Sequence, residues 1–363
     1  MWSGSGVRST CRRSPLGLRL VSLAGGGSCR LIRAFGSEQM ISVIIPCYNA
    51  SSTLRAAVES ALSQSYPKKE VIIIDDGSTD SSSDIIKSYG AAVVAEFWPN
   101  QGASKARNHG TRLARGDYIQ YLDADDVLEP DTLAKRVAVL ETRGADIAYT
   151  DWRLFTVSRD GSICQGEVVV VPLDRFGQDA EAACASSAFW APPAAILYRR
   201  WVVDRIGQWN PRLPVIQDAR FIFDAARVGA QFTRVEGVGA LYRISDDSLS
   251  HRSRERFMRD CFVNATEIEA IWREGGELTP ARRRALIQIW SYIATGTFQA
   301  NLPEFGEACG RLRMVSGRLH LDLQVRAFLS SIFGQPTISW IEQRLRRMLR
   351  PIRRLSRSYA MER

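Results

Sequence analysis

The sequence lacks the residue patterns that mark zinc-binding, disulfide-rich or membrane-spanning proteins. Its 363 residues include seven cysteines and three histidines, but no C-x-x-C pair and no H-x-x-x-H spacing. Scattered cysteines in an odd number are typical of reduced, packed thiols rather than of a disulfide framework or a zinc site. No apolar run approaches the ~20 residues that a membrane helix needs. We therefore expect a cytoplasmic protein that does not span a membrane.

Three common nucleotide- and metal-binding motifs are also missing. No G-x-G-x-x-G follows the first predicted strand, and no G-x-x-x-x-G-K-[ST] occurs anywhere in the chain. These absences exclude a dinucleotide fingerprint and a P-loop. An EF-hand starting at Asp123 fails as well, because Val127 and Leu128 occupy positions that need an oxygen ligand and a turn glycine.

Positive charge is concentrated at the two ends of the chain. The net charge is +9, yet residues 1–39 hold six Arg and one acid, and residues 340–363 hold eight Arg and two Glu. That leaves 34 basic and 36 acidic residues between them. The central body is therefore not a basic platform, and we expect no nucleic-acid partner.

The two charged ends predict different things. Residues 1–39 are rich in Arg and Ser, which permits a transit-like presequence, a disordered arm, or sequence upstream of a true start at Met40. Residues 340–363 place apolar side chains on one stripe at helical spacing and Arg on the other faces. Such a basic amphipathic helix favours peripheral binding to an anionic membrane on its cytoplasmic face, with an oligomer contact or a solvated helix as alternatives.

From Met40 onward, short apolar runs alternate with segments of helical periodicity. The predicted strands are 41–46, 71–76, 91–97 and 117–122, and the predicted helices between them are 51–65, 76–90 and 104–116. Continuous apolar strands separated by amphipathic helices indicate a doubly wound α/β fold with a parallel sheet covered on both faces. After residue 255 the pattern is helical without a catalytic motif, so we expect an α/β body at 40–255 and a helical region at 256–339.

Polar clusters follow three of the predicted strands, as PCYNA, DDGSTD and DADD. Ligands in open α/β sheets bind beyond the carboxyl ends of strands, so these clusters should meet at the site. If the chain stays extended, Asp123 and Asp125 leave the same face with Cα atoms ~6.5–7 Å apart. Two carboxylates alone make an open site for a hard divalent cation that arrives with a diphosphate.

Four segments show a resemblance to a known family: SVIIPCYNA (42–50), VIIIDDGSTD (71–80), NQGASKARNHG (100–110) and GDYIQYLDADD (116–126). In order and approximate spacing they resemble the family 2 glycosyltransferases, whose nucleotide-diphospho-sugar-binding fold is called GT-A. The resemblance implies an α/β, GT-A type, mostly parallel and Rossmann-like sheet over residues 40–255, to which the helical region is an appendage.

The resemblance also implies roles for residues at the strand ends. It implies a nucleotide base and ribose site lined by Pro46, Tyr48, Asn49 and Asp76. The alternative for residues 75–80 is a turn and helix cap, with Asp80 the more structural residue. Lys105 and Arg107 are implied to neutralise the donor phosphates, and their alternative is a solvated helix face.

By the same resemblance, Asp123 and Asp125 form the D-x-D pair that holds Mn²⁺ or Mg²⁺. Asp125 is the firmer metal ligand, Asp123 contacts ribose or metal, and Asp126 is interpreted as a helix cap. A metal bridging the diphosphate would stabilise the charge that develops on the leaving nucleoside diphosphate.

A later segment, 213–232, resembles the family motif in which an acid starts a helix near the acceptor. Here the pair is Gln217 and Asp218, so Asp218 is the candidate general base, or alternatively an N-cap of that helix. A base opposite the leaving group implies inversion at the anomeric carbon. Trp209, in the preceding turn, is predicted either to stack on a sugar or to lie in the core.

The chain departs from the family after residue 241, where many relatives have Tyr-Arg-x-His. Ser245 stands at the position of that His, so a third protein ligand to the metal is not implied. His251 and Arg252 are expected to be able to fold back over the diphosphate, and Arg243 and His251 are retained as candidate site residues.

The sequence thus predicts an inverting, metal-dependent glycosyltransferase that moves a sugar from a nucleotide-diphosphate donor to a glycan, glycolipid or other hydroxyl acceptor in cell-surface polysaccharide or glycolipid synthesis. The alternatives are a sugar-nucleotide hydrolase or nucleotidyltransferase on the same fold, and a non-catalytic glycan-binding protein. A processive synthase is excluded because the Q-x-x-R-W motif and membrane helices are absent.

Overall fold

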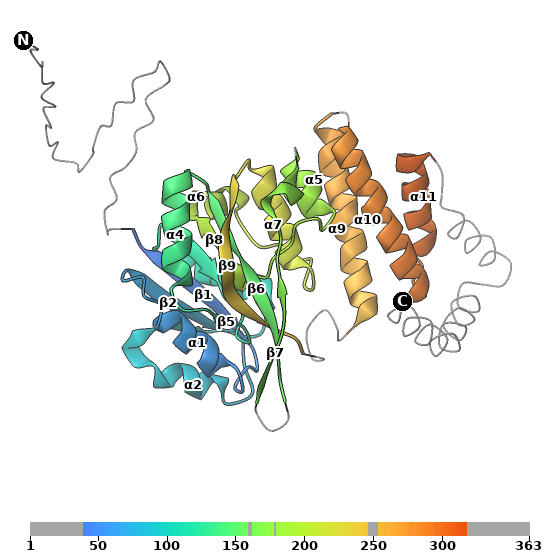
Figure 1. The fold of residues 1–363 in the computed structure, drawn as a ribbon. Helices are drawn as coiled ribbons and strands as arrows, with labels where there is room; N and C mark the ends of the chain where they lie inside the picture. Colours follow the sequence, from blue (N-terminus) through green and yellow to red (C-terminus); the bar gives the residue numbers. More distant parts are fainter. Residues whose placement is uncertain (1–38, 159–161, 178, 246–252, 277, 318–363) are drawn as a thin grey trace, which may run out of the picture.

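A computed structural model describes residues 39–317 except 159–161, 178, 246–252 and 277 (Figure 1). The N-terminal arm up to residue 38, His251 and the predicted amphipathic helix at 340–363 lie outside the described residues. No helix in the described part of the chain is both long and apolar enough to cross a membrane.

A nine-stranded sheet forms the centre of the protein. Its strands are β1 (Ile41–Cys47), β2 (Lys69–Asp75), β3 (Val94–Phe97), β4 (Tyr118–Tyr121), β5 (Val127–Leu128), β6 (Ile147–Val157), β7 (Ile163–Val169), β8 (Ile196–Arg199) and β9 (Phe232–Arg243). Their order is β3-β2-β1-β4-β8-β6-β9-β5, and β7 pairs with β6 as a protruding hairpin (Figure 1). Strands β1 to β4, β6 and β9 run in one direction, so their carboxyl ends share one edge.

Helices α1 (Leu54–Leu62), α2 (Ser82–Ser88) and α3 (Ala103–Leu113) connect the parallel strands. Every residue of β1 is buried, as expected for an apolar strand covered on both faces. Helix α4 (Thr132–Arg143) packs on β6 and β9 in the other half of the sheet. The predicted α/β class with a mostly parallel sheet is confirmed, and β5, β7 and β8 add antiparallel pairs.

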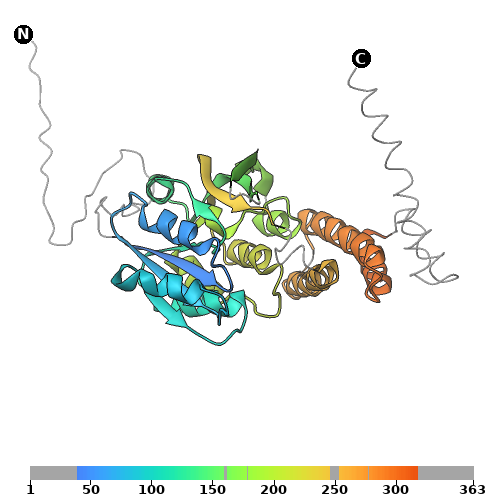
Figure 2. The ribbon, with the colours of Figure 1, turned by 90° about the horizontal axis from the view of Figure 1, so that it is seen from below.

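Three long helices, α9 (Arg254–Glu274), α10 (Pro280–Gln299) and α11 (Phe305–Ser316), form the predicted helical appendage beside the sheet (Figures 1 and 2). The appendage packs against α5 (Ala180–Ala185) and lies next to α7 (Gln217–Arg227). In the contact with α5, Arg282 forms ion pairs with Asp179 at 3.2 Å and Glu181 at 2.9 Å. The Trp272 indole donates a hydrogen bond to Glu181 at 2.8 Å.

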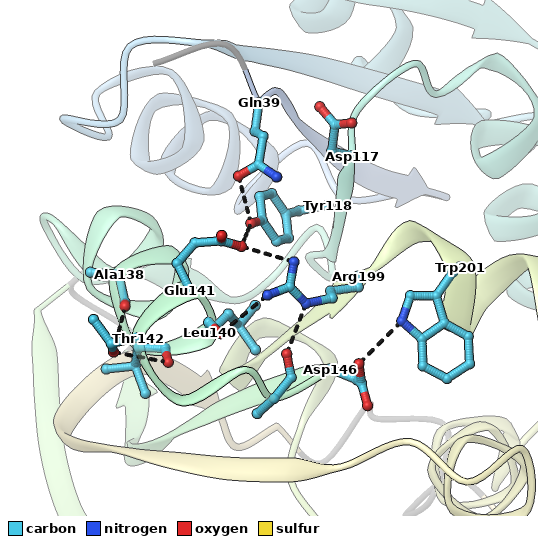
Figure 3. Close-up of polar contacts among 12 residues, drawn as sticks. Gln39, Asp117, Tyr118, Ala138, Leu140, Glu141, Thr142, Asp146, Arg199 and Trp201 are labelled. Atoms are coloured by element: carbon cyan, nitrogen blue, oxygen red, sulfur yellow. Dashed lines mark hydrogen bonds and ion pairs between the residues drawn. The ribbon is translucent and has the colours of Figure 1, made fainter. Parts of the chain in front are cut away.

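A polar cluster fixes the opposite, amino-terminal edge of β4 (Figure 3). Arg199 donates to the carbonyl oxygens of Leu140 at 3.1 Å and Ala145 at 2.8 Å, and forms an ion pair with Glu141 at 2.8 Å. The Tyr118 hydroxyl also donates to Glu141, at 2.5 Å. Because cations stabilise helix C-termini, this cluster anchors the end of α4 away from the strand ends where the polar motifs emerge.

Beneath those strand ends, one buried cation joins four elements. The fully buried Arg136 guanidinium of α4 donates hydrogen bonds to Gln120 of β4 at 2.6 Å and Thr150 of β6 at 2.7 Å, and to the Ala194 carbonyl at 2.9 Å. Burial lowers the pKa of Arg136 to about 9. The hydrogen bonds compensate the loss of hydration, so α4 is locked to the centre of the sheet.

Candidate active site

The loops after β1 and β2 are tied together by side chains of the PCYNA and DDGSTD motifs. Asn49, in a left-handed conformation (φ 48°), accepts a hydrogen bond from the Thr79 amide at 2.7 Å. Asp80 accepts from the amides of Ser51 and Ser82. Burial alone would raise the pKa of Asp80, but hydrogen bonds from Ser82 and Ser51 lower it overall. These bonds agree with a structural role for Asp80.

Two predicted nucleotide-site residues differ sharply in exposure. Pro46 lies buried within β1, whereas Tyr48 follows that strand and is 48% exposed. Asp76 is buried, and its carboxylate accepts hydrogen bonds from the amides of Gln101 at 2.9 Å and Gly102 at 2.7 Å. Asp76 therefore holds the turn that starts α3, where Gly102 has a φ of 94° that favours glycine.

The two candidate phosphate-binding cations of α3, Lys105 and Arg107, differ in their exposure to solvent. Lys105 is exposed and donates to Gln101, while Arg107 is only 4% exposed. The Arg107 guanidinium forms an ion pair with Asp123 and lies 4.5 Å from the centre of the Trp209 ring. Its Nε and Nη1 atoms are buried without a protein partner. Arg107 thus keeps hydrogen-bond donors available for an anion.

The three acids of the DADD motif gather in a turn. The Asp126 amide donates to the Asp123 carbonyl at 3.1 Å, so the chain is not extended here and the expected same-face geometry of Asp123 and Asp125 is wrong. The turn instead keeps the Asp125 carboxylate within the influence of the Asp123 charge. Desolvation and the charge of Asp123 raise the pKa of Asp125 to about 6.

Asp126 is not a helix cap. The short strand β5 follows it and pairs with β9, so α4 begins only at Thr132, after Asp131. The Asp126 side chain is 1% exposed and accepts the Arg243 amide at 3.0 Å, while its Oδ2 has no partner. Desolvation, then the charges of Asp125 and Asp123, raise its pKa well above the ordinary value.

Asp218 lies in the first turn of α7, one residue after its start. The N-cap is Ile216, so the N-cap interpretation of Asp218 is wrong. Its Oδ1 accepts the Ala219 amide at 2.8 Å, and its Oδ2 accepts the Trp190 indole N–H at 2.9 Å. Desolvation raises the pKa of Asp218, although the two hydrogen bonds and the charge of Arg107 lower it.

The neighbours of Asp218 have structural roles. Gln217 is buried and accepts a hydrogen bond from Ser104 of α3 at 2.5 Å. Trp209 is 2% exposed and stacks on Phe221 at 4.2 Å between ring centroids. Since the Arg107 guanidinium also covers the Trp209 ring, no face remains for a sugar. The stacking alternative for Trp209 is therefore wrong, and Trp209 is a core residue.

Strand β9 ends among these acids. Desolvation raises the pKa of Tyr242, and the charges of Asp126, Asp218, Asp123 and Asp125 raise it further. Arg243 follows, with a buried Nε that has no partner, and its charge acts on Asp125. Arg243 therefore lies near the acids of this turn, whereas His251 is outside the described residues.

The carboxylates at this edge can hold a divalent cation only if a substrate supplies further ligands. Desolvation, followed by the charges of neighbouring carboxylates, raises the pKa of both Asp125 and Asp126, and a bound cation would favour their ionised forms. Within the described residues, however, no group of three or more His, Cys, Asp or Glu side chains has the arrangement of a metal cage. The residues suit a metal whose remaining ligands are diphosphate oxygens and water.

Residues 42–174 match the family described as glycosyl transferase family 2. This part of the chain is therefore similar to family 2 glycosyltransferases. TuaG of Bacillus subtilis, named for teichuronic acid biosynthesis, is 36% identical over 143 residues, which are 38% of this chain and 52% of TuaG. The glucosyltransferase WfaP of Escherichia coli, whose name gives an α-D-GlcNAc-diphosphoundecaprenol substrate, is 37% identical over 116 residues, 31% of this chain and 46% of WfaP. The chain spans about half the length of these curated relatives.

Solved structures of other proteins share the fold of this chain. Residues 1–349 of Staphylococcus aureus TarS in complex with UDP-GlcNAc align with a TM-score of 0.61 at 18% identity, over 85% of this chain and 92% of that one. The mannosyltransferase PcManGT of Pyrobaculum calidifontis, in complex with GDP-Man and Mn²⁺, aligns with a TM-score of 0.50 at 19% identity over 84% of each chain. At these identities the likeness shows the fold, which is GT-A.

Sequence reasoning missed two residues of the site. Trp190 lies in the loop between α5 and the short helix η3 (Pro193–Ala195), and Tyr242 lies near the carboxyl end of β9. Neither stands in a matched motif. The available signal for Trp190 was a Phe-Trp pair that Ala191 separates from Pro192 and Pro193.

Proposed function

We propose that this protein is an inverting, metal-dependent glycosyltransferase that moves a sugar from a nucleotide-diphosphate donor to a hydroxyl group. The observation that supports this most directly is the pairing of Arg107 with Asp123 near Asp218. An anion-binding group and a candidate base thus face one site from α3 and α7. Transfer needs both, one for the leaving diphosphate and one for the acceptor proton.

The donor is proposed to bind along the ends of β1, β2 and β4. Tyr48 offers an exposed aromatic face to the base, and Asn49 and Asp76 shape the surrounding loops. Arg107 donates its two unpartnered N–H groups, and Lys105 adds positive charge, to the diphosphate. Asp123 and Asp125 would hold Mn²⁺ or Mg²⁺, which supplies charge stabilisation for the leaving nucleoside diphosphate.

Asp218 is proposed to accept the proton of the attacking hydroxyl. Desolvation raises its pKa, which makes it a stronger base than an exposed aspartate. Attack from the side of α7, opposite the diphosphate, inverts the anomeric carbon.

The acceptor is proposed to be a membrane-linked glycan of cell-surface polysaccharide synthesis. The support is the naming of the relatives, TuaG for teichuronic acid and WfaP for a diphosphoundecaprenol-linked sugar. Peripheral association with the cytoplasmic membrane face would bring the protein to such an acceptor. Deleting residues 340–363 without any change in liposome binding would exclude that segment as the attachment.

The proposal is tested by incubating the protein with Mn²⁺ or Mg²⁺ and a panel of UDP-, GDP- and dTDP-sugars, with and without lipid-linked acceptors, and measuring released nucleoside diphosphate. We expect release that depends on both metal and acceptor. Asp218→Asn should reduce turnover by at least about a hundredfold. Asp125→Ala should abolish turnover and weaken donor binding, while Asp84→Asn, an exposed acid on α2, serves as the matched control.

Other outcomes separate the alternatives. Release that no acceptor stimulates would favour a sugar-nucleotide hydrolase. Full glycan binding by both Asp125→Ala and Asp218→Asn, without any turnover by the unaltered protein, would favour a non-catalytic glycan-binding protein.

A further inference from the structure

The carboxylate of Asp218 is held at both oxygens before any substrate arrives. Oδ1 accepts the Ala219 amide of its own helix, and Oδ2 accepts the indole N–H of Trp190, 28 residues earlier in the chain. Two hydrogen bonds from different directions fix the plane of the carboxylate. One lone pair on each oxygen remains for a further partner.

Trp190 is itself held in place by aromatic neighbours. Its ring meets the buried Trp152 of β6 edge to face at 5.8 Å and Tyr242 of β9 at 5.9 Å. The preceding residue, Phe189, is buried against Tyr149 at 4.8 Å. The indole therefore has little freedom to rotate away, and Trp190 remains half-buried at the site rather than in the core.

Among the described residues, the charged groups that act most strongly on Asp218 come from other parts of the fold. Arg107 of α3 and Asp123 after β4 act on it with opposite signs. Tyr198 of β8 and Tyr242 of β9 both have raised pKa values, first through desolvation and in part through the charge of Asp218. Among these neighbours, Trp190 is the one whose side chain is hydrogen-bonded to the carboxylate.

We propose that Trp190 is a positioning residue for sugar transfer, because its indole N–H holds the Asp218 carboxylate in the orientation from which it accepts the acceptor proton. This inference rests on the proposed function. It assigns a role to a residue outside the region that matches the family, which ends at residue 174.

The chemistry of the hydrogen bond explains why it matters. The indole N–H is a donor only, so it stabilises the ionised carboxylate and offers nothing to a protonated oxygen that also donates. Losing it would leave the Asp218 carboxylate held only through its bond to the Ala219 amide, and would raise the pKa of Asp218 further. Both effects reduce the fraction of enzyme that is ready to accept a proton.

The test is the Trp190→Phe variant, which keeps an aromatic ring and removes the N–H. We expect the acidic limb of the kcat/KM profile to move up by about one pH unit, because a hydrogen bond to the charged form is lost. At pH 7 we expect kcat to fall about tenfold with the donor KM unchanged. Trp152→Phe is the matched control, since Trp152 packs beside Trp190 but does not bond Asp218. The control should leave the acidic limb where it is.

A second measurement needs no turnover. In the ¹H–¹⁵N spectrum of the full chain, the indole resonance that disappears in Trp190→Phe should shift with pH at the midpoint of the kinetic limb, and Asp218→Asn should abolish that titration. The inference is overturned if the acidic limb of the kcat/KM profile is unchanged in Trp190→Phe. It is also overturned if the indole resonance titrates in the same way in Asp218→Asn as in the unaltered protein. Failure of the proposed function gives a different result, namely no transfer from any donor while the indole titration persists.

Discussion

At the residue scale, Arg107 stands out because it is buried with only part of its hydrogen-bonding capacity used. One nitrogen pairs with Asp123, the guanidinium covers Trp209, and two further nitrogens have no protein partner. A buried donor without a partner is costly unless a ligand satisfies it. The proposed donor diphosphate would supply the missing acceptors.

We expect Arg107→Lys to weaken the binding of nucleoside diphosphates by about tenfold, since an ammonium cannot pair with Asp123, cover Trp209 and contact phosphate in the same planar arrangement. Isothermal titration with UDP, GDP and dTDP in the presence of Mn²⁺ measures the change. Arg112→Lys, on the exposed side of the same helix, is the matched control. Equal affinities for both variants would remove Arg107 from the donor site.

The raised pKa of Asp218 predicts opposite effects of pH on activity and stability. Asp218 must be ionised to accept a proton, so kcat/KM should fall as pH drops, with a midpoint above the ordinary aspartate pKa of ~4. The folded state binds this proton more tightly than the unfolded chain, so the contribution of Asp218 to the free energy of unfolding grows as pH falls through its folded pKa. Rate profiles and urea unfolding between pH 5 and 8, compared with Asp218→Asn, check both signs. A profile with its midpoint at or below ~4 would contradict the assignment.

Individual residues differed in how well the sequence predicted them. Asp123 and Arg107 are in short matched motifs, and the structure places them in contact. Asp126 was misassigned because nothing local indicates that β5 intervenes before α4, as that strand exists only through its pairing with β9. Trp209 and Trp190 look alike in sequence, and only tertiary packing makes one a core residue and the other a partner of Asp218.

At the scale of elements, α7 is held from two sides. Ser104 of α3 bonds Gln217 at its start, and Asp260 of α9 accepts the Val215 amide at 2.8 Å just before it. Further along, Arg220 forms an ion pair with Glu267 of α9 at 2.5 Å. The helix that presents Asp218 therefore takes its position partly from the appendage.

We expect Asp260→Ala to lower kcat by about tenfold without changing the affinity for nucleoside diphosphates, because a small displacement of a catalytic group is enough to slow transfer. Asp260→Asn should retain most activity, since an amide oxygen still accepts the Val215 N–H. Steady-state kinetics together with nucleotide titration separates the two effects. A parallel loss of nucleotide affinity in Asp260→Ala would point to general disruption instead.

The elements of the parallel half were predicted well and those of the other half were not. Predicted strands 41–46 and 71–76 correspond to β1 and β2, because continuous β-branched runs identify strands covered on both faces. The predicted helix 51–65 contains α1 and extends past it at both ends. Strands β6, β8 and β9 were not predicted, since their pairings join segments far apart in the sequence.

At the scale of the whole molecule, the proposed donor site lies almost entirely within residues 42–174, while Asp218 and its supports lie beyond them. A ligand that binds the folded state stabilises it by mass action, by about 2.7 kcal/mol at a hundred times its Kd. We expect a nucleoside diphosphate with Mn²⁺ to raise the midpoint of thermal unfolding by a few degrees. EDTA should remove most of that increase, as should Asp125→Ala, and an increase of the same size without metal would contradict the proposed metal site.

The contacts between α9 and α7 suggest how related proteins could come to use different acceptors. The strand ends proposed to face the nucleotide are stabilised by their own sheet, whereas α7, proposed to face the acceptor, is braced by α9 of the helical appendage. On that proposal, we expect exchange of the appendage between relatives to alter which hydroxyl is glycosylated and to leave the choice of sugar nucleotide unchanged.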